Sequence, residues 1–105
     1  MAATKWADVA QRAGQQLAAA VREHPAVESL WVSEDDEGIE LWLVTAPTEP
    51  AVTSRLHAAG GPLYDQFPEA YVRFYVMNRR NFPAVDLDAR LTERGQLIER
   101  FHSAG

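Results

Sequence analysis

Four consecutive acidic side chains form the densest group in the sequence that could bind a cation: Glu34, Asp35, Asp36 and Glu37. Carboxylate oxygens are the ligands that calcium and magnesium prefer in proteins. Calcium loops, however, alternate ligands with spacer residues and place a glycine in mid-loop, and this run does neither. We therefore expect a solvated turn that discourages aggregation, and no metal site.

Ser54 and His57 are three residues apart in a segment expected to be helical, so their side chains share one face. Nucleophilic catalysis by such a pair also needs an oxyanion hole, and no glycine motif of that kind accompanies them. The Gly60-Gly61-Pro62 sequence lacks the lysine and Ser/Thr partner of a phosphate-binding loop. The chain has no cysteine, which excludes thiol catalysis and cysteine zinc sites. We expect no catalytic residue, no metal and no cofactor.

The composition indicates one domain over residues 1–105. Its apolar fraction of 47% and charged fraction of 24% are those of an ordinary globular protein. The net charge of −5 disfavours nucleic-acid binding, although Arg73, Arg79 and Arg80 form a small basic group. No apolar run approaches bilayer length, and residues 1–6 lack the build of a signal peptide, so no membrane contact and a cytoplasmic location are expected. The predominance of arginine over lysine is typical of a GC-rich bacterial gene.

Hydrophobic periodicity predicts where helices and strands lie along the chain. In the loop between the first two strands, Gly38 is expected to supply a positive φ. The helical pattern over 52–67 either kinks at residues 60–62 or breaks there into two short helices. Residues 79–95 are poorly patterned and are expected to form a loop or a short helix. The predicted elements are a helix at 5–24, strands at 27–34 and 39–45, the helical segment at 52–67, and strands at 70–78 and 96–101.

These elements predict an α/β (α+β) fold with the order α-β-β-α-β-β. The first two strands should form an antiparallel hairpin. The second strand is apolar on both faces, which favours a central position, and it should run parallel to the third strand, with a right-handed crossover. The result is a small mixed sheet with two main helices on one face.

Alternation along the strands assigns side chains to two sheet faces. One face is aliphatic and suits the hydrophobic core. The other is aromatic, and since few predicted helices remain to cover it, we expect an open binding face. Either residues 79–95 or a second copy of the chain is expected to cover this aromatic face. A platform that binds a ligand is a further alternative. Glu40 and Arg73 could pair across strands. The candidate binding residues on this face are Trp31, Glu40, Trp42, Tyr71, Arg73 and Tyr75.

The strand pattern resembles the small bacterial nucleotidyltransferases of the DNA polymerase β-like superfamily. Residues 27–32 would be their first strand, 38–43 the acid-bearing second strand, and 71–74 the third. The resemblance implies two metal-binding aspartates on the second strand, but Gly38 stands at the first position and only Glu40 remains. Arg73 stands near the position where those proteins carry their third acidic residue. Two-metal phosphoryl transfer needs convergent carboxylates, so the resemblance implies a degenerate, non-catalytic relative.

Two functions follow from these observations. The first is a non-enzymatic protein-interaction domain, as a homodimer or as a partner subunit of another protein, which uses the open aromatic face. The alternative is a divergent nucleotide-binding or nucleotidyltransferase-like domain centred on Glu40 and Arg73.

Overall fold

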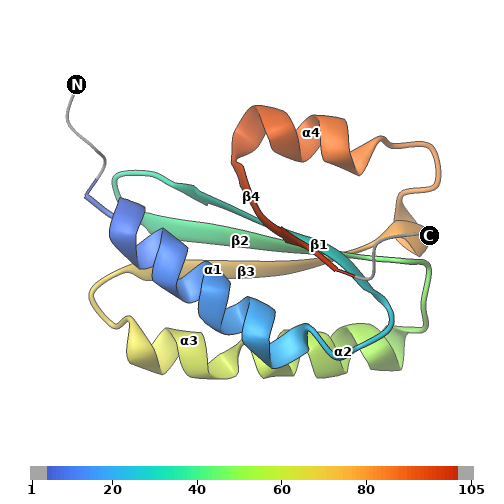
Figure 1. Cartoon of the computed structure of the whole chain (residues 1–105), viewed down its shortest axis with the longest axis horizontal. Coiled ribbons are helices and arrows are strands. Elements are labelled where there is room, and N and C mark those ends of the chain that lie inside the picture. The colour runs from blue at the N-terminus through green and yellow to red at the C-terminus, as the bar shows by residue number, and fades with distance from the viewer. Residues whose placement is uncertain (1–4, 102–105) are drawn as a thin grey trace.

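The computed structural model describes residues 5–101, which form a mixed α/β fold around one four-stranded sheet (Figure 1). The strand order is β3-β2-β1-β4. Strand β1 runs antiparallel to β2 and β4, and β2 runs parallel to β3. The elements are α1 (Ala7–Val21), β1 (Val27–Glu34), β2 (Gly38–Thr45), α2 (Pro50–Ala59), α3 (Gly61–Gln66), β3 (Tyr71–Asn78), the 3-10 helix η1 (Arg79–Asn81), α4 (Leu87–Arg94) and β4 (Gln96–Arg100).

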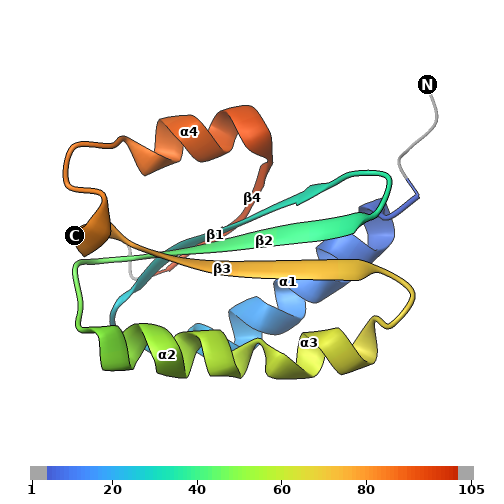
Figure 2. The ribbon, with the colours of Figure 1, turned by 180° about the vertical axis from the view of Figure 1, so that it is seen from behind.

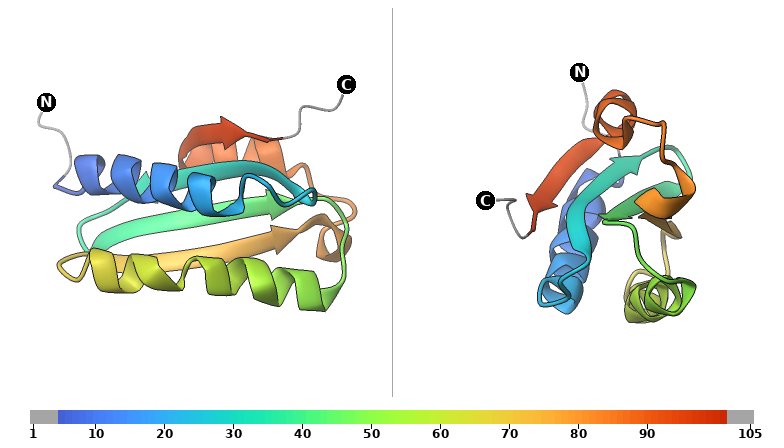
Figure 3. Two further views of the ribbon diagram at one scale, coloured as in Figure 1. Left: turned by 60° about the horizontal axis from the view of Figure 1, so that its bottom comes forward. Right: turned by 90° about the vertical axis from the view of Figure 1, so that its right-hand side faces the viewer.

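Helices α1, α2 and α3 pack on one face of the sheet, and α4 lies on the other (Figure 3). The first part of the chain follows the predicted order, and the helical segment takes the second of its two predicted forms. It breaks at Gly60 into α2 and α3, with Pro62 in the first turn of α3. None of the helices within residues 5–101 is long and apolar enough to cross a membrane.

The main hydrophobic core lies between the sheet and the first three helices. Helix α1 contributes an apolar stripe at steps of three and four residues, including Ala10, Ala13 and Leu17, because these positions fall on one helical face. The sheet contributes the aliphatic face that alternation predicts, including Leu30 and Leu41, which are fully buried. Sequence periodicity therefore located this core correctly.

Helix α4 adds to the two main helices, and it is the short helix that was one of the two predicted forms of residues 79–95. The sequence predicts two main helices on one face, but residues 79–95 form η1 and α4, and α4 covers part of the opposite face. The Asp86 side chain begins α4 by accepting a hydrogen bond from the Ala89 N–H at 3.1 Å. Leu87 and Leu91, one turn apart, are buried against the sheet. Two apolar residues are a weak periodic signal, so the helix depends on the surface that it covers.

Gly38 does not have the positive φ that the sequence predicts. It is the first residue of β2, where Tyr71 of the parallel strand β3 lies directly beside it. A Cβ atom on Gly38 would overlap the Tyr71 backbone, with its carbonyl carbon only 2.8 Å away. The glycine is needed because the two backbones approach closely there, and the Tyr71 N–H donates to the Glu37 carbonyl at 3.1 Å at the same place.

We expect Gly38→Ala to lower the free energy of unfolding by about 1–3 kcal/mol, because the added methyl forces β2 and β3 apart. Urea unfolding followed by circular dichroism measures this loss. Gly61→Ala is the matched control, since an added Cβ there meets no atom within 4 Å. Equal stability of the two variants would contradict the close approach.

Candidate interaction surface on strand β3

The six residues predicted to form the aromatic face do point to the same side of the sheet, but they differ in exposure. The register places Trp31 opposite Trp42, and Glu40 and Trp42 beside Arg73 and Tyr75. Trp31 and Trp42 are buried, with 3% and 6% of their surface exposed. Tyr71 and Tyr75 are exposed at 59% and 42%. The open face is therefore smaller than expected, and it lies on β3.

The tryptophans are covered by the chain itself. They form a second hydrophobic cluster with Val44 of β2 and with Leu87 and Leu91 of α4. The Trp31 indole N–H donates to the Ser29 hydroxyl at 3.0 Å, so its polar group has a partner inside this cluster. Two segments were expected as the cover of this face, residues 79–95 or a second copy of the chain. Residues 79–95 cover the tryptophans in the structure.

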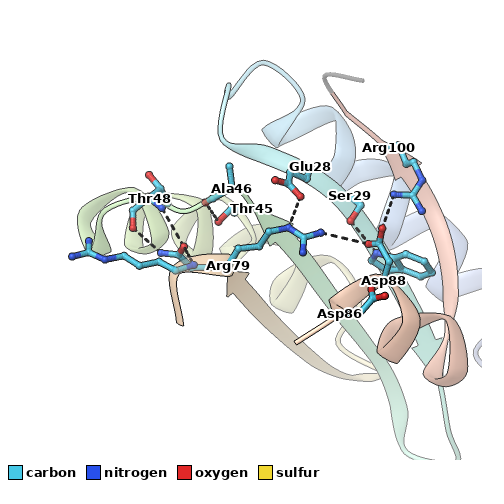
Figure 4. A network of polar contacts seen from close by, with 12 residues as sticks. Glu28, Ser29, Thr45, Ala46, Thr48, Arg79, Asp86, Asp88 and Arg100 are labelled. Carbon is cyan, nitrogen blue, oxygen red and sulfur yellow. Dashed lines mark hydrogen bonds and ion pairs between the residues drawn. The ribbon is translucent and has the colours of Figure 1, made fainter. Parts of the chain in front are cut away.

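A set of ion pairs joins α4 to the sheet (Figure 4). The Arg79 guanidinium, which follows β3, contacts Glu28 of β1 at 2.7 Å and Asp88 of α4 at 3.7 Å. Asp88 also contacts Arg100 of β4 at 3.3 Å, and the Arg100 guanidinium lies 5.8 Å from the centre of the Trp31 ring. Sequence analysis assigned Arg79 only to a small basic group. Its role is to hold the covering helix, which depends on contacts between distant segments.

Arg73 is the charged centre of the part of the face that stays open. Its guanidinium donates to Asp35 at 2.9 Å, lies 3.8 Å from Glu40, and lies 4.9 Å from the centre of the Tyr71 ring. The pairing with Glu40 was expected from the strand register, whereas the closer pairing with Asp35 was not. The Nε atom of Arg73 is buried and has no hydrogen-bond partner among the described residues.

Asp35 connects the acidic turn to β3. One carboxylate oxygen accepts the N–H groups of Glu37 and Gly38 at 2.9 and 3.0 Å, and the other accepts from Arg73. The Arg73 hydrogen bond and then the two backbone hydrogen bonds lower the pKa of Asp35 below its ordinary 3.8. The turn is thus not merely solvated, because one of its acids organises the loop and neutralises Arg73. Within residues 5–101, no group of three or more side chains could hold a metal ion.

A shallow groove separates β3 from α2. Ser54 and His57 line it together with Thr53, and Tyr75 and Met77 form part of the opposite side. The His57 Nε2 atom donates to the Phe74 carbonyl at 3.2 Å, and its ring stacks on the Phe74 ring with centres 5.2 Å apart. His57 is therefore held against the strand by two contacts that have no role in activating Ser54.

Strand β3 is also an edge of the sheet, as the back view shows (Figure 2). The Tyr71 N–H is bonded towards β2, so alternate residues from Tyr71 onwards direct their backbone groups to β2. Val72, Phe74 and Val76 direct theirs to the open edge. The candidate surface combines this edge with the exposed side chains of Tyr71 and Tyr75 and with the partly buried Arg73 between them. It can bind another protein by side-chain contact and by strand pairing.

We expect Leu91→Ala to cost about 2–5 kcal/mol of stability, because it leaves a cavity between α4 and the tryptophans. The tryptophan emission should shift to longer wavelength as water reaches Trp31 and Trp42. Arg90→Ala is the control, because Arg90 is on the exposed side of the same helix. An unchanged emission and stability in Leu91→Ala would contradict the covering role of α4.

The lowered pKa of Asp35 predicts a loss of stability in acid. The stabilisation by Asp35 is complete above its unfolded pKa of 3.8 and disappears as the pH falls through the lower folded value. Asp35→Asn should therefore lower the melting temperature at neutral pH and have little effect well below that folded pKa. Melting curves from acid to neutral pH measure this, with Asp36→Asn as the control that removes the same charge without the Arg73 contact. Parallel curves for the native chain and Asp35→Asn would refute it.

Comparisons of the sequence with family models and with curated proteins, and of the structure with solved structures, found no match. The resemblance to nucleotidyltransferases therefore stays a prediction from the strand pattern. The function has to be inferred from the chemistry of the β3 surface.

Proposed function

We propose that this chain is a non-enzymatic protein-interaction domain that associates through the β3 surface, either with a second copy or as a subunit beside another protein. One observation carries the proposal: the edge strand β3 presents two exposed tyrosines, Tyr71 and Tyr75, on either side of Arg73. Tyrosine and arginine are enriched in protein interfaces, where they supply much of the binding energy.

The geometry of these side chains favours binding at low cost. Tyr75 stacks on the buried Trp42, with ring centres 6.2 Å apart and the ring planes inclined by 20°. Tyr71 contacts the Arg73 guanidinium, which Asp35 and Glu40 hold in turn. Side chains that are already ordered lose less conformational entropy when a partner binds. The paired carboxylates also reduce the charge that a partner would have to desolvate.

A divergent nucleotide-binding or nucleotidyltransferase-like domain is the second candidate, and it would have to use Glu40 and Arg73. In that function Glu40 would hold a cation and Arg73 a phosphate. The two side chains lie 3.8 Å apart, and Asp35 already accepts from Arg73. Binding a nucleotide would require these pairs to separate, so the contacts favour the interaction domain.

The proposal predicts that the 11.7 kDa chain self-associates, with a mass near that of a dimer in light scattering as its concentration rises. Tyr71→Ala and Tyr75→Ala should each weaken association by about 2 kcal/mol, which is roughly 30-fold in the dissociation constant.

Tyr64→Ala is the matched control, because Tyr64 is a comparably exposed tyrosine, at 43%, on α3 rather than on the β3 surface. It should associate like the native chain. A native chain that remains monomeric up to near-millimolar concentration would contradict self-association through β3.

A further inference from the structure

We propose that two copies of the chain pair edge to edge, β3 antiparallel to β3 about a two-fold axis, and so join two four-stranded sheets into one continuous sheet. The inference rests on the proposed interaction function and specifies its partner, its backbone pairing and its register. Four observations lead to it: the difference between the two sheet edges, the direction of the backbone groups, the charge pattern along β3 and the composition of α2.

The two edges of the sheet differ in how they are protected against pairing. Strand β4 has five residues, is interrupted by a register shift against β1, and carries Glu99 and Arg100. Both charges are held in ion pairs, Glu99 with Arg22 at the C-terminal end of α1 and Arg100 with Asp88 of α4. Short length, irregular register and charge are the devices by which sheet edges avoid other strands. Strand β3 has eight residues in unbroken register with β2. Its single charged residue is Arg73, which Asp35 and Glu40 already pair within the same chain.

The backbone of β3 offers a regular set of partners at that open side. Val72, Phe74 and Val76 present their N–H and C=O groups there, as the bonding of Tyr71 to Glu37 requires. The Phe74 carbonyl accepts from His57 and has a second lone pair available. The extended edge ends at Asn78, which caps η1 by accepting from the Arg80 N–H and whose side chain also bonds to Thr48. The free segment is therefore 72–76.

Two-fold symmetry limits how two such segments can pair. With Phe74 on the axis, all three edge-facing residues find partners: Phe74 pairs with its own copy, and Val72 pairs with Val76. With Arg73 on the axis, two arginines would stand directly opposite each other, which is unfavourable. With Tyr75 on the axis, Val72 loses its partner. The register centred on Phe74 is therefore preferred.

This register also makes the side chains on the outer face of β3 complementary, which favours a second copy over an unrelated peptide. Tyr71 and Tyr75 are exposed there, whereas Arg73 is partly buried and Met77 packs partly against the tryptophan cluster. Arg73 comes opposite Tyr75 of the second copy, an arrangement suited to a cation–π contact. Tyr71 comes opposite Met77, and sulfur–aromatic contacts are favourable. No like charges meet between residues 71 and 77. Each of these side chains therefore finds a suitable partner in a second copy of the same sequence.

Helix α2 leaves room for the second copy beside the edge. Its residues that line the groove along β3 are Thr53, Ser54 and His57, and its exposed Ala51 and Ala58 are small. Arg55 is the single residue within α2 that carries a fixed charge. In an antiparallel edge pair the two α2 helices lie on the same side of the joined sheet, so small and uncharged side chains are required between them.

Engineered cysteines test the register directly, because the native chain has none. Tyr71→Cys and Met77→Cys are prepared as separate chains and mixed in equal amounts under mild oxidation. In the proposed register, residues 71 and 77 form a non-hydrogen-bonded pair with Cα atoms about 4.5 Å apart, within the range that a disulfide spans. A disulfide joining the two different chains is expected, and neither variant should cross-link alone.

The backbone contribution is tested by Val76→Pro. The Val76 N–H points away from β2, so proline removes no hydrogen bond within the sheet but removes one from each side of the dimer. Light scattering should show association weakened by about 10- to 100-fold. Val76→Thr is the control, because it keeps the N–H and a β-branched side chain, and it should associate nearly as the native chain does.

The outcomes separate this inference from the proposed function. Suppose that the native chain dimerises, but that mixed Tyr71→Cys and Met77→Cys chains form no disulfide at a concentration where they still associate, or that association tolerates Val76→Pro. Either result overturns strand pairing and leaves the interaction surface intact. Cross-linking of Tyr71→Cys with itself indicates another arrangement and also overturns the register. A native chain that stays monomeric up to near-millimolar concentration overturns both strand pairing and self-association through β3, and leaves only the association with another protein.

Discussion

The burial of Trp31 and Trp42, which lie opposite each other on the two central strands, is the constraint on which the rest of this structure depends. Two indole rings on the face opposite the main core bury an apolar area of about 150–250 Å² each, worth several kcal/mol apiece at ~25 cal/mol per Å². Leaving them in water would forfeit that gain. The chain meets the requirement with α4, and because α4 covers β1 and β2, the tyrosines of β3 stay exposed.

The strands could be predicted to within a residue or so because alternation is a local signal. Val27–Glu34 was placed correctly, and Gly38–Thr45 began one residue earlier than expected. For residues 79–95 the sequence predicted a loop or a short helix without deciding between them, since the buried side of α4 consists of two leucines that pack on the tryptophans beneath it. A closer signal was present in Asp86, which caps the helix one residue before Leu87.

The sequence could predict which residues make up the candidate site, but not which of them are exposed. Register arithmetic placed Glu40 beside Arg73, because pairing between parallel strands follows from counting along each one. Exposure depends on which distant segment lies above a residue, and nothing near Trp31 or Trp42 in sequence indicates the cover. The Asp35–Arg73 pair was missed for the same reason. It forms where the hairpin turn meets the start of β3, through the backbone contact of Glu37 with Tyr71.

Side chains of β3 alternate between the hydrophobic core and the outer face, so natural selection acts on the two sets for different properties. Residues 72, 74 and 76 contribute to the core, while residues 71, 73 and 75 face outwards, so each set can diverge without altering the other. A lineage could therefore exchange one binding specificity for another by point substitutions at 71 and 75 while keeping the same fold. Inserting or deleting one residue has no such freedom, because it would turn the tyrosines inwards and the valines outwards. Along this strand, a new binding specificity can arise by substitution but not by a change in the length of the strand.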